Sequence, residues 1–167
     1  MGNGAVSGAM NKDVKAKAEM LVRRPPTEVF EAFVNPDVTT KFWFTKSSGR
    51  LESGKKVIWE WEMYGVSTTV DVKALEKDRR ILIEWSGYAG PETVEWTFTP
   101  HGDGATFVRV TNSGFHGSED EIVKQALDST GGFTWLLAGL KAYLEYNVKL
   151  NLVADAHPKG LESTRPE

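Results

Sequence analysis

The sequence predicts an α+β protein in which a curved antiparallel sheet covers one long C-terminal helix. Segments of alternating apolar and polar residues dominate positions 46–112, with turn residues between them, and this period of two is typical of strands. After residue 118 the apolar residues recur every three or four positions, which is typical of a helix. The apolar sheet face must be covered, and only that last helix is long enough to cover it.

The chain before the sheet predicts one strand and two small helices. The segment "KAKAEMLVRRP" alternates as a strand does, and Pro25 and Pro26 end it, because proline cannot donate to a strand ladder. Thr27 can cap the helix "TEVFEAFVN", whose apolar residues share one face. Asn35 and Pro36 end that helix, and a second short turn leads into "KFWF".

The central segments predict an antiparallel meander with one apolar face, divided by the turns "SGK", "MYG", "EKDR", "YAGPE" and "HGDG". In "KKVIWEWEMYG" the alternation places Trp59, Trp61 and Met63 on one face, with Glu60 and Glu62 on the other. Burying a tryptophan contributes roughly 5 kcal/mol, whereas an unpaired buried carboxylate costs several kcal/mol. The tryptophans are therefore expected inside, and the glutamates on a solvated outer face.

The C-terminal part predicts a capped helix. Ser118 and Glu121 have the spacing of a capping box. After Gly131 and Gly132, one apolar stripe of the helix is expected to face the sheet. Leu137 lies outside this stripe, and Gly139 is expected where helix and sheet approach closely. Its members are Trp135, Leu136, Gly139, Leu140, Tyr143, Leu144 and Val148.

Length and composition indicate one domain of ordinary globular type. We expect a flexible lead-in at 1–13, a single domain at 14–153 and a flexible tail at 154–167. A net charge of -3 argues against nucleic-acid binding. The chain has no cysteine and no apolar run long enough for membrane insertion, so a cytoplasmic location is expected. No cofactor is predicted, and three scattered histidines do not predict a metal site.

The order of several segments resembles one superfamily. These are "RPPTEVFEAFVNPDVTTKFWF", "SGKKVIWEWEMYG", "VDVKALEKDRRILIEWS", "HGDGATFVRVTNSGF" and "GGFTWLLAGLKAYLE". They are similar to SRPBCC (START-like, helix-grip) proteins, and most to the branch named for activators of heat shock protein 90 ATPase. The resemblance implies six to seven strands wrapped round the C-terminal helix, with a deep cavity between. Relatives use this cavity for lipids, steroids or aromatic compounds, or in some cases for cyclisation.

The favoured function is therefore binding of a hydrophobic or aromatic small molecule, although simple core packing explains the tryptophans equally well. The expected lining residues are Trp43, Trp59, Trp61, Met63, Trp85, Trp96, Phe98, Trp135, Leu136, Gly139 and Tyr143. One alternative is a stress-related co-chaperone whose partner is a heat shock protein 90. The other is an enzyme of the polyketide cyclase or aromatase kind, with Tyr64, Tyr88 and His116 as the first candidates.

Overall fold

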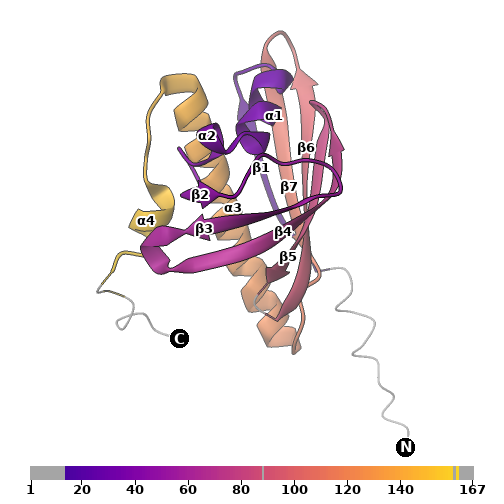
Figure 1. Cartoon of the computed structure of the whole chain (residues 1–167), viewed down its shortest axis with the longest axis vertical. Coiled ribbons are helices and arrows are strands. Elements are labelled where there is room, and N and C mark those ends of the chain that lie inside the picture. The colour runs from indigo at the N-terminus through magenta and orange to yellow at the C-terminus, as the bar shows by residue number, and fades with distance from the viewer. Residues whose placement is uncertain (1–13, 88, 160, 162–167) are drawn as a thin grey trace, which may run out of the picture.

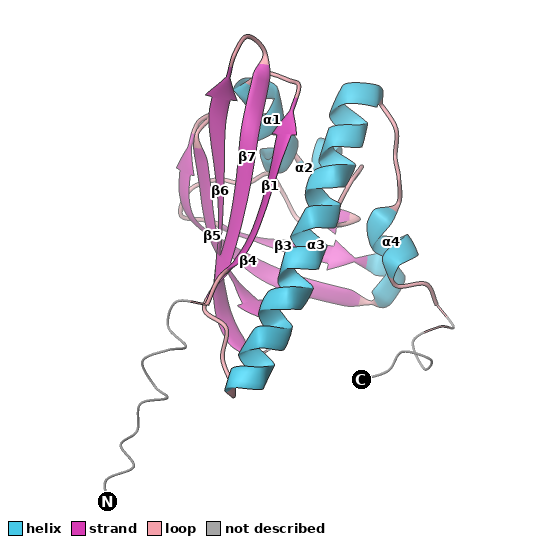
Figure 2. Cartoon of the chain, turned by 180° about the vertical axis from the view of Figure 1, so that it is seen from behind, coloured by secondary structure: helices cyan, strands magenta, loops and turns pink. Residues whose placement is uncertain are grey.

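Seven strands form one antiparallel sheet, and a long helix lies against one of its faces (Figures 1 and 2). The computed structural model describes residues 14–87, 89–159 and 161. The elements are β1 (Ala16–Val22), α1 (Pro26–Val34), α2 (Pro36–Thr39), β2 (Lys46–Ser47), β3 (Lys56–Trp61), the 3-10 turn η1 (Glu62–Tyr64), β4 (Val66–Glu76), β5 (Arg80–Gly87), β6 (Gly90–His101), β7 (Ala105–Ser113), α3 (Glu119–Tyr146) and α4 (Leu152–Ala156). The predicted α+β architecture is confirmed.

The strand order is β1-β7-β6-β5-β4-β3-β2, so β2 to β7 form a meander and β1 joins at its far edge. The inward faces follow the predicted alternation. Val70 and Val72 of β4, Ile81 and Ile83 of β5, and Val94 of β6 are all fully buried. The apolar face of the sheet is thus set by the period of the sequence.

Strand β3 is shorter than the alternation predicts. It ends at Trp61, and η1 turns the chain back into β4, with Gly65 in the left-handed region at φ 61°. Glycine reaches that conformation without a steric penalty. The prediction that Met63 lies on the inward strand face is wrong, because Met63 belongs to this turn.

Helix α3 is one continuous helix of 28 residues that runs through Gly131 and Gly132. The predicted capping box is present, since Ser118 and Glu121 satisfy each other's backbone N–H groups. The helix ends at Tyr146, with Asn147 in the left-handed region, so Val148 lies beyond it and is exposed.

The buried arc of α3 is wider than the predicted stripe. Leu137, expected outside, is fully buried. The reason is that α3 contacts β1 and also packs against the chain around Phe42 and against α4. Gly139 is close to Phe42 and not to the sheet: a Cβ at Gly139 would lie 3.2 Å from the Phe42 carbonyl oxygen. The helix is therefore buried on more than one side.

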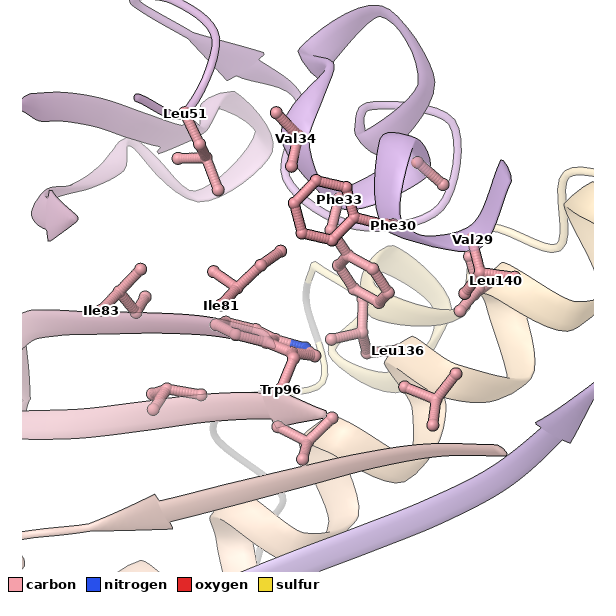
Figure 3. Close-up of a cluster of buried hydrophobic side chains, with 14 of the residues drawn as sticks. Val29, Phe30, Phe33, Val34, Leu51, Ile81, Ile83, Trp96, Leu136 and Leu140 are labelled. Carbon is pink, nitrogen blue, oxygen red and sulfur yellow. The ribbon is translucent and has the colours of Figure 1, made fainter. Parts of the chain in front are cut away.

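The core is densely packed beneath α1 and the C-terminal half of α3 (Figure 3). The rings of Phe30, Phe33, Trp96 and Phe98 contact one another at centroid distances of 5.6–5.7 Å. Leu136 approaches this cluster from α3. Edge-to-face and tilted aromatic pairs of this kind stabilise a core beyond their buried area.

Polar contacts fasten the last turns of α3 to β1. Glu145 accepts a hydrogen bond from the Arg23 N–H at 3.0 Å, and Lys141 lies 2.6 Å from the same carboxylate oxygen. Lys141 also donates to the Leu21 carbonyl. Burial opposes ionisation of Glu145, but the Arg23 N–H and Lys141 outweigh it and hold its pKa below the ordinary value.

The expected lead-in at 1–13 lies outside the described residues. The expected domain boundary at residue 153 falls inside α4, which Figure 2 shows beside α3. Among the described helices, none has the length and apolar character needed to cross a membrane.

Candidate functional site

A cavity of about 770 Å³ lies between the N-terminal half of α3 and the sheet. That half of the helix runs past the end of the sheet remote from α1 (Figure 2). The wall comes from β3 to β7, α3, α4 and the segments that precede β2 and α3. The lining residues are Trp43, Trp61, Val66, Thr68, Trp85, Ser86, Gly87, Glu92, Asn112, Phe115, Glu121, Lys124, Gln125, Asp128, Ser129, Gly132, Phe133, Trp135, Val153 and His157.

Trp43 is the centre of the aromatic wall. Its ring lies 4.9–6.1 Å from six other aromatic rings, three of which also line the cavity: those of Trp61, Trp85 and Phe133. Trp85 and Phe133 stack on each other at 6.1 Å and 23°. Large apolar rings in mutual contact make a rigid surface suited to a hydrophobic ligand.

The turn after α2 holds Trp43 in place. The Thr39 hydroxyl is buried and donates to the Ala32 carbonyl at 2.6 Å, which ties α2 to α1. The N–H groups of Phe42 and Trp43 both donate to the Thr39 carbonyl. The position of the aromatic wall is therefore fixed by main-chain hydrogen bonds.

Buried polar residues line the cavity next to the aromatic wall. Asn112 of β7 donates to the Thr93 carbonyl and accepts from the Ser129 hydroxyl at 2.7 Å, which links the sheet to α3. Glu92 of β6 is only 7% exposed. Among the residues that the structure describes, Glu92 has no hydrogen-bond or ion-pair partner. Glu92 is thus an acidic residue at a mostly buried position of the cavity wall, where charged side chains are rare.

Three further lining residues carry buried polar atoms without a hydrogen-bond partner: the Thr68 hydroxyl, the Trp85 indole N–H and the Gln125 side-chain oxygen. Buried polar groups are normally satisfied. Three such atoms around one cavity indicate that the space is suited to a molecule with polar groups of its own.

Helix α4 covers one side of the cavity through Val153 and His157. The Tyr64 hydroxyl lies 3.0 Å from the carbonyl oxygens of both these residues, and the Trp135 ring contacts the His157 ring at 5.6 Å. Asn147 and Asn151, both at positive φ, turn the chain between α3 and α4. The tyrosine hydroxyl and the ring contacts with His157, together with packing against α3, hold the covering helix in place.

Four of the predicted ligand-binding residues line the cavity: Trp43, Trp61, Trp85 and Trp135. The others lie elsewhere. Trp59, Trp96, Phe98 and Leu136 belong to the packed core, Gly139 lies against Phe42, Tyr143 packs against the core from outside, and Met63 lies in η1. The sequence thus predicts the inward face of the sheet but does not separate cavity from core.

Sequence reasoning missed Glu92 and Asn112, although the signal was present. Glu92 is separated from Val94 and Trp96 by even numbers of positions along β6, and Asn112 is related in the same way to Val108 and Val110 on β7. Both polar residues therefore lie on the inward face. A polar residue at an inward position of a strand is informative, because polar side chains are seldom buried without a reason.

The two enzyme candidates that the structure describes, Tyr64 and His116, do not share a site. Tyr64 bonds to α4, His116 is exposed and outside the cavity lining, and Tyr88 lies outside the described residues. Glu60 and Glu62 point outward, with Glu60 3.8 Å from Lys46. Within residues 14–87, 89–159 and 161 there is no group of three acidic or histidine side chains that could hold a metal ion.

Comparisons with known proteins identify relatives of this fold. Residues 23–145 match the family described as "Activator of Hsp90 ATPase homolog 1-like protein". No curated protein matches the chain. Protein SSP2350 from Staphylococcus saprophyticus is 31% identical, with a TM-score of 0.71 over 82% of this chain and 96% of that one.

Two further solved structures share the fold. DynU16, from the dynemicin biosynthetic locus, is 24% identical with a TM-score of 0.71; the match covers 82% of this chain and 49% of DynU16, so this chain spans about half its length. Aha1 from Colwellia psychrerythraea, solved as a dimer, is 19% identical with a TM-score of 0.68 over 80% of this chain and 97% of that one.

Proposed function

The chain belongs to the family of Activator of Hsp90 ATPase homolog 1-like proteins, and from this premise we propose that it binds a hydrophobic or aromatic small molecule in the cavity beside α3. The observation that carries the proposal is the aromatic wall around an open volume of about 770 Å³. Ligand pockets usually have volumes of about 300–1,000 Å³ and mostly apolar walls with a few polar groups. A cytoplasmic location is part of the proposal.

The contrast with the neighbouring core supports this function. Close packing is the normal state of a protein interior, and the core under α1 consists of buried rings in mutual contact. The cavity, by contrast, is lined by four tryptophans and two phenylalanines, and three of its lining residues carry buried polar atoms without a hydrogen-bond partner in the described structure. Such a wall has apolar surface and hydrogen-bonding groups to offer a ligand.

Two neighbouring glycines of α3 supply a matched test. A Cβ added at either Gly131 or Gly132 meets no atom within 4 Å, but only Gly132 lines the cavity. We expect Gly132→Leu to fill part of the cavity and to weaken binding of the neutral probe N-phenyl-1-naphthylamine by roughly tenfold or more. Gly131→Leu should leave its Kd unchanged within about twofold.

Isothermal titration calorimetry measures these dissociation constants, with thermal melts to show that each variant is folded. Equal affinities of the two variants, or no binding of the probe to the unaltered protein, would contradict the proposal. Native mass spectrometry of the purified protein adds an independent readout: a stoichiometric extra mass, extracted and identified, gives the ligand class directly.

The family name makes stimulation of a heat shock protein 90 ATPase the alternative function. That activity depends on contacts between protein surfaces and is indifferent to the interior of the cavity. If Gly132→Leu retains stimulation in an ATPase assay while it loses the probe, the two activities are separate properties of the chain. A cyclase-like reaction would instead appear as turnover of a polyketide-like substrate.

A further inference from the structure

The most unusual group in the cavity is the carboxylate of Glu92. It lies on the inward face of β6, more than nine-tenths buried, and it is without a hydrogen-bond or ion-pair partner in the described part of the chain. Removing an ionised carboxylate from water is strongly unfavourable unless a cation or hydrogen-bond donors replace the water. Glu92 lines the cavity, where a cation or a hydrogen-bond donor of a ligand can pair with its carboxylate.

The backbone beside Glu92 leaves room for its carboxylate. Gly87 ends β5 next to it, and a Cβ added at Gly87 would lie 1.7 Å from Glu92 Oε2. No side chain larger than hydrogen fits at position 87 unless the carboxylate moves. Since both residues line the cavity, the carboxylate is held at its wall.

The charges around the cavity favour a cation. Its lining contains the carboxylates of Glu92, Glu121 and Asp128, against the single lysine Lys124. Lys124 is exposed and makes no ion pair with any of the three in the described structure. Carboxylates that outnumber cations at a cleft give it a negative potential, which raises the local concentration of cations.

The aromatic residues beside Glu92 are suited to the same charge. Trp85 is the direct neighbour of Glu92 in the β5–β6 register, and its ring stacks on Phe133 and lies 6.1 Å from Trp43. Directly opposed residues on antiparallel strands have Cβ atoms about 4.5–5.5 Å apart. The negative faces of indole rings attract organic cations, so ring and carboxylate can act on one ammonium group.

From these observations we propose that the cavity takes a hydrophobic amine whose protonated amino group pairs with Glu92 and whose apolar part lies against Trp43, Trp85 and Phe133. This inference rests on the proposed ligand-binding function and specifies its ligand class. A carboxylic acid on the same hydrocarbon is repelled, and an alcohol, which can donate one hydrogen bond to the carboxylate but carries no charge, is intermediate.

A matched set of three probes tests the proposal: 2-(1-naphthyl)ethylamine, 2-(1-naphthyl)ethanol and 1-naphthylacetic acid, titrated by calorimetry into the unaltered protein. The amine is expected to bind roughly tenfold or more tighter than the alcohol, because its positive charge adds Coulomb attraction to a hydrogen bond that the alcohol can also donate. The acid is expected to bind most weakly.

Glu92→Gln keeps the shape of the side chain and removes its charge. It should reduce amine affinity to about that of the alcohol and leave alcohol binding within roughly threefold. Gly87→Ala, which displaces the carboxylate, should reduce amine binding in the same direction. Glu84→Gln makes the same chemical change on the outer face of the neighbouring strand, outside the cavity lining, and should change none of the three affinities.

The outcomes separate the two proposals. If the alcohol binds and the amine does not bind more tightly, or if Glu92→Gln retains the amine preference, the amine proposal is overturned and ligand binding stands. If none of the three probes binds, both are overturned. The comparison of amine with alcohol uses the unaltered protein, so it decides the matter even if a variant fails to fold.

Discussion

The two halves of α3 use one face of one helix in opposite ways. In the C-terminal half that face holds Leu136 and Leu140, both fully buried against a packed aromatic core. In the N-terminal half, one to three turns earlier, the same face holds Gln125, Ser129 and Gly132, which border an open cavity. The difference teaches that a cavity here needs no change of fold: shorter and polar side chains along a continuous helix suffice.

The largest expected effect lies in the packed half. Leu140→Ala should lower the free energy of unfolding by about 2–5 kcal/mol, because it removes a fully buried side chain and leaves a void in a packed core. Urea unfolding followed by circular dichroism measures the loss. Leu127→Ala, on the same helix but 69% exposed, should cost less than about 0.5 kcal/mol. A similar loss for both variants would contradict the division of the helix.

Alanine at the two helical glycines should have opposite effects. At Gly132 the new methyl group meets open space, so the better helix propensity of alanine should stabilise the protein by about 0.5–1 kcal/mol. At Gly139 the methyl group would lie 3.2 Å from the Phe42 carbonyl oxygen, in a buried contact that has little freedom to relax. There we expect a net loss of about 1 kcal/mol.

Melting temperatures of the two single variants measure this contrast, since about 1 kcal/mol shifts the midpoint by roughly 2–4 °C in a domain of this size. Stabilisation by both alanines would show that the helix can move away from Phe42. The packed half would then be less rigid than its contacts indicate.

A pH-dependent effect is expected where the packed half meets β1. The folded-state pKa of Glu145 is lowered, so its ionised form stabilises the fold at pH values above the ordinary pKa of 4.5, and this stabilisation is lost as the pH falls through the lower folded-state value. Glu145→Gln should therefore cost about 1 kcal/mol at pH 7. In acid, below the folded-state pKa, the variant should match the unaltered protein.

Urea unfolding across that range measures the difference. A loss that is constant with pH would show that ionisation of Glu145 is not the source of the stabilisation. No loss at any pH would show that an amide oxygen accepts from the Arg23 N–H as well as the carboxylate does.

The smallest expected effect concerns α4, which covers one side of the cavity. Tyr64→Phe removes the hydroxyl that bonds to the carbonyls of α4, worth about 0.5–1.5 kcal/mol locally. Amide hydrogens of residues 152–157 should exchange roughly three- to tenfold faster, with global stability nearly unchanged. Hydrogen exchange with mass spectrometry measures this, and equal protection would mean that ring contacts and packing against α3 hold α4 without the hydroxyl.

The sequence predicts the architecture well because its signals are local. Alternation in β4 to β7 sets the inward face, and the Ser118 capping box marks the start of α3. The division of that interior into core and cavity is not local. Trp59 and Trp61 have the same strand period, yet one is 2% exposed in the core and the other lines the cavity, because their depth depends on elements distant in sequence.

Some features were within reach and were interpreted wrongly. The apolar stripe was expected only after Gly131 and Gly132, but α3 runs through both glycines, since a glycine costs only about 1 kcal/mol in a helix that is packed elsewhere along its length. Leu137 was predicted to point outward because a single apolar stripe was assumed for the helix. It is buried, because α3 has contacts on more than one side. Glu92 was predictable as an inward residue from strand period alone, but its lack of a partner was not.

The ring cluster around Trp43 has an optical consequence. The indoles of Trp43 and Trp59 lie 4.9 Å apart at an interplanar angle of 62°, a geometry in which their electronic transitions couple and are not parallel. Coupled, non-parallel transitions give paired circular-dichroism bands of opposite sign in the far ultraviolet. The spectrum of the folded protein will therefore contain an exciton signal from the tryptophans, and helix content calculated from peptide bands alone will be in error. A molecule that displaces Trp43 will change that signal without any change in secondary structure.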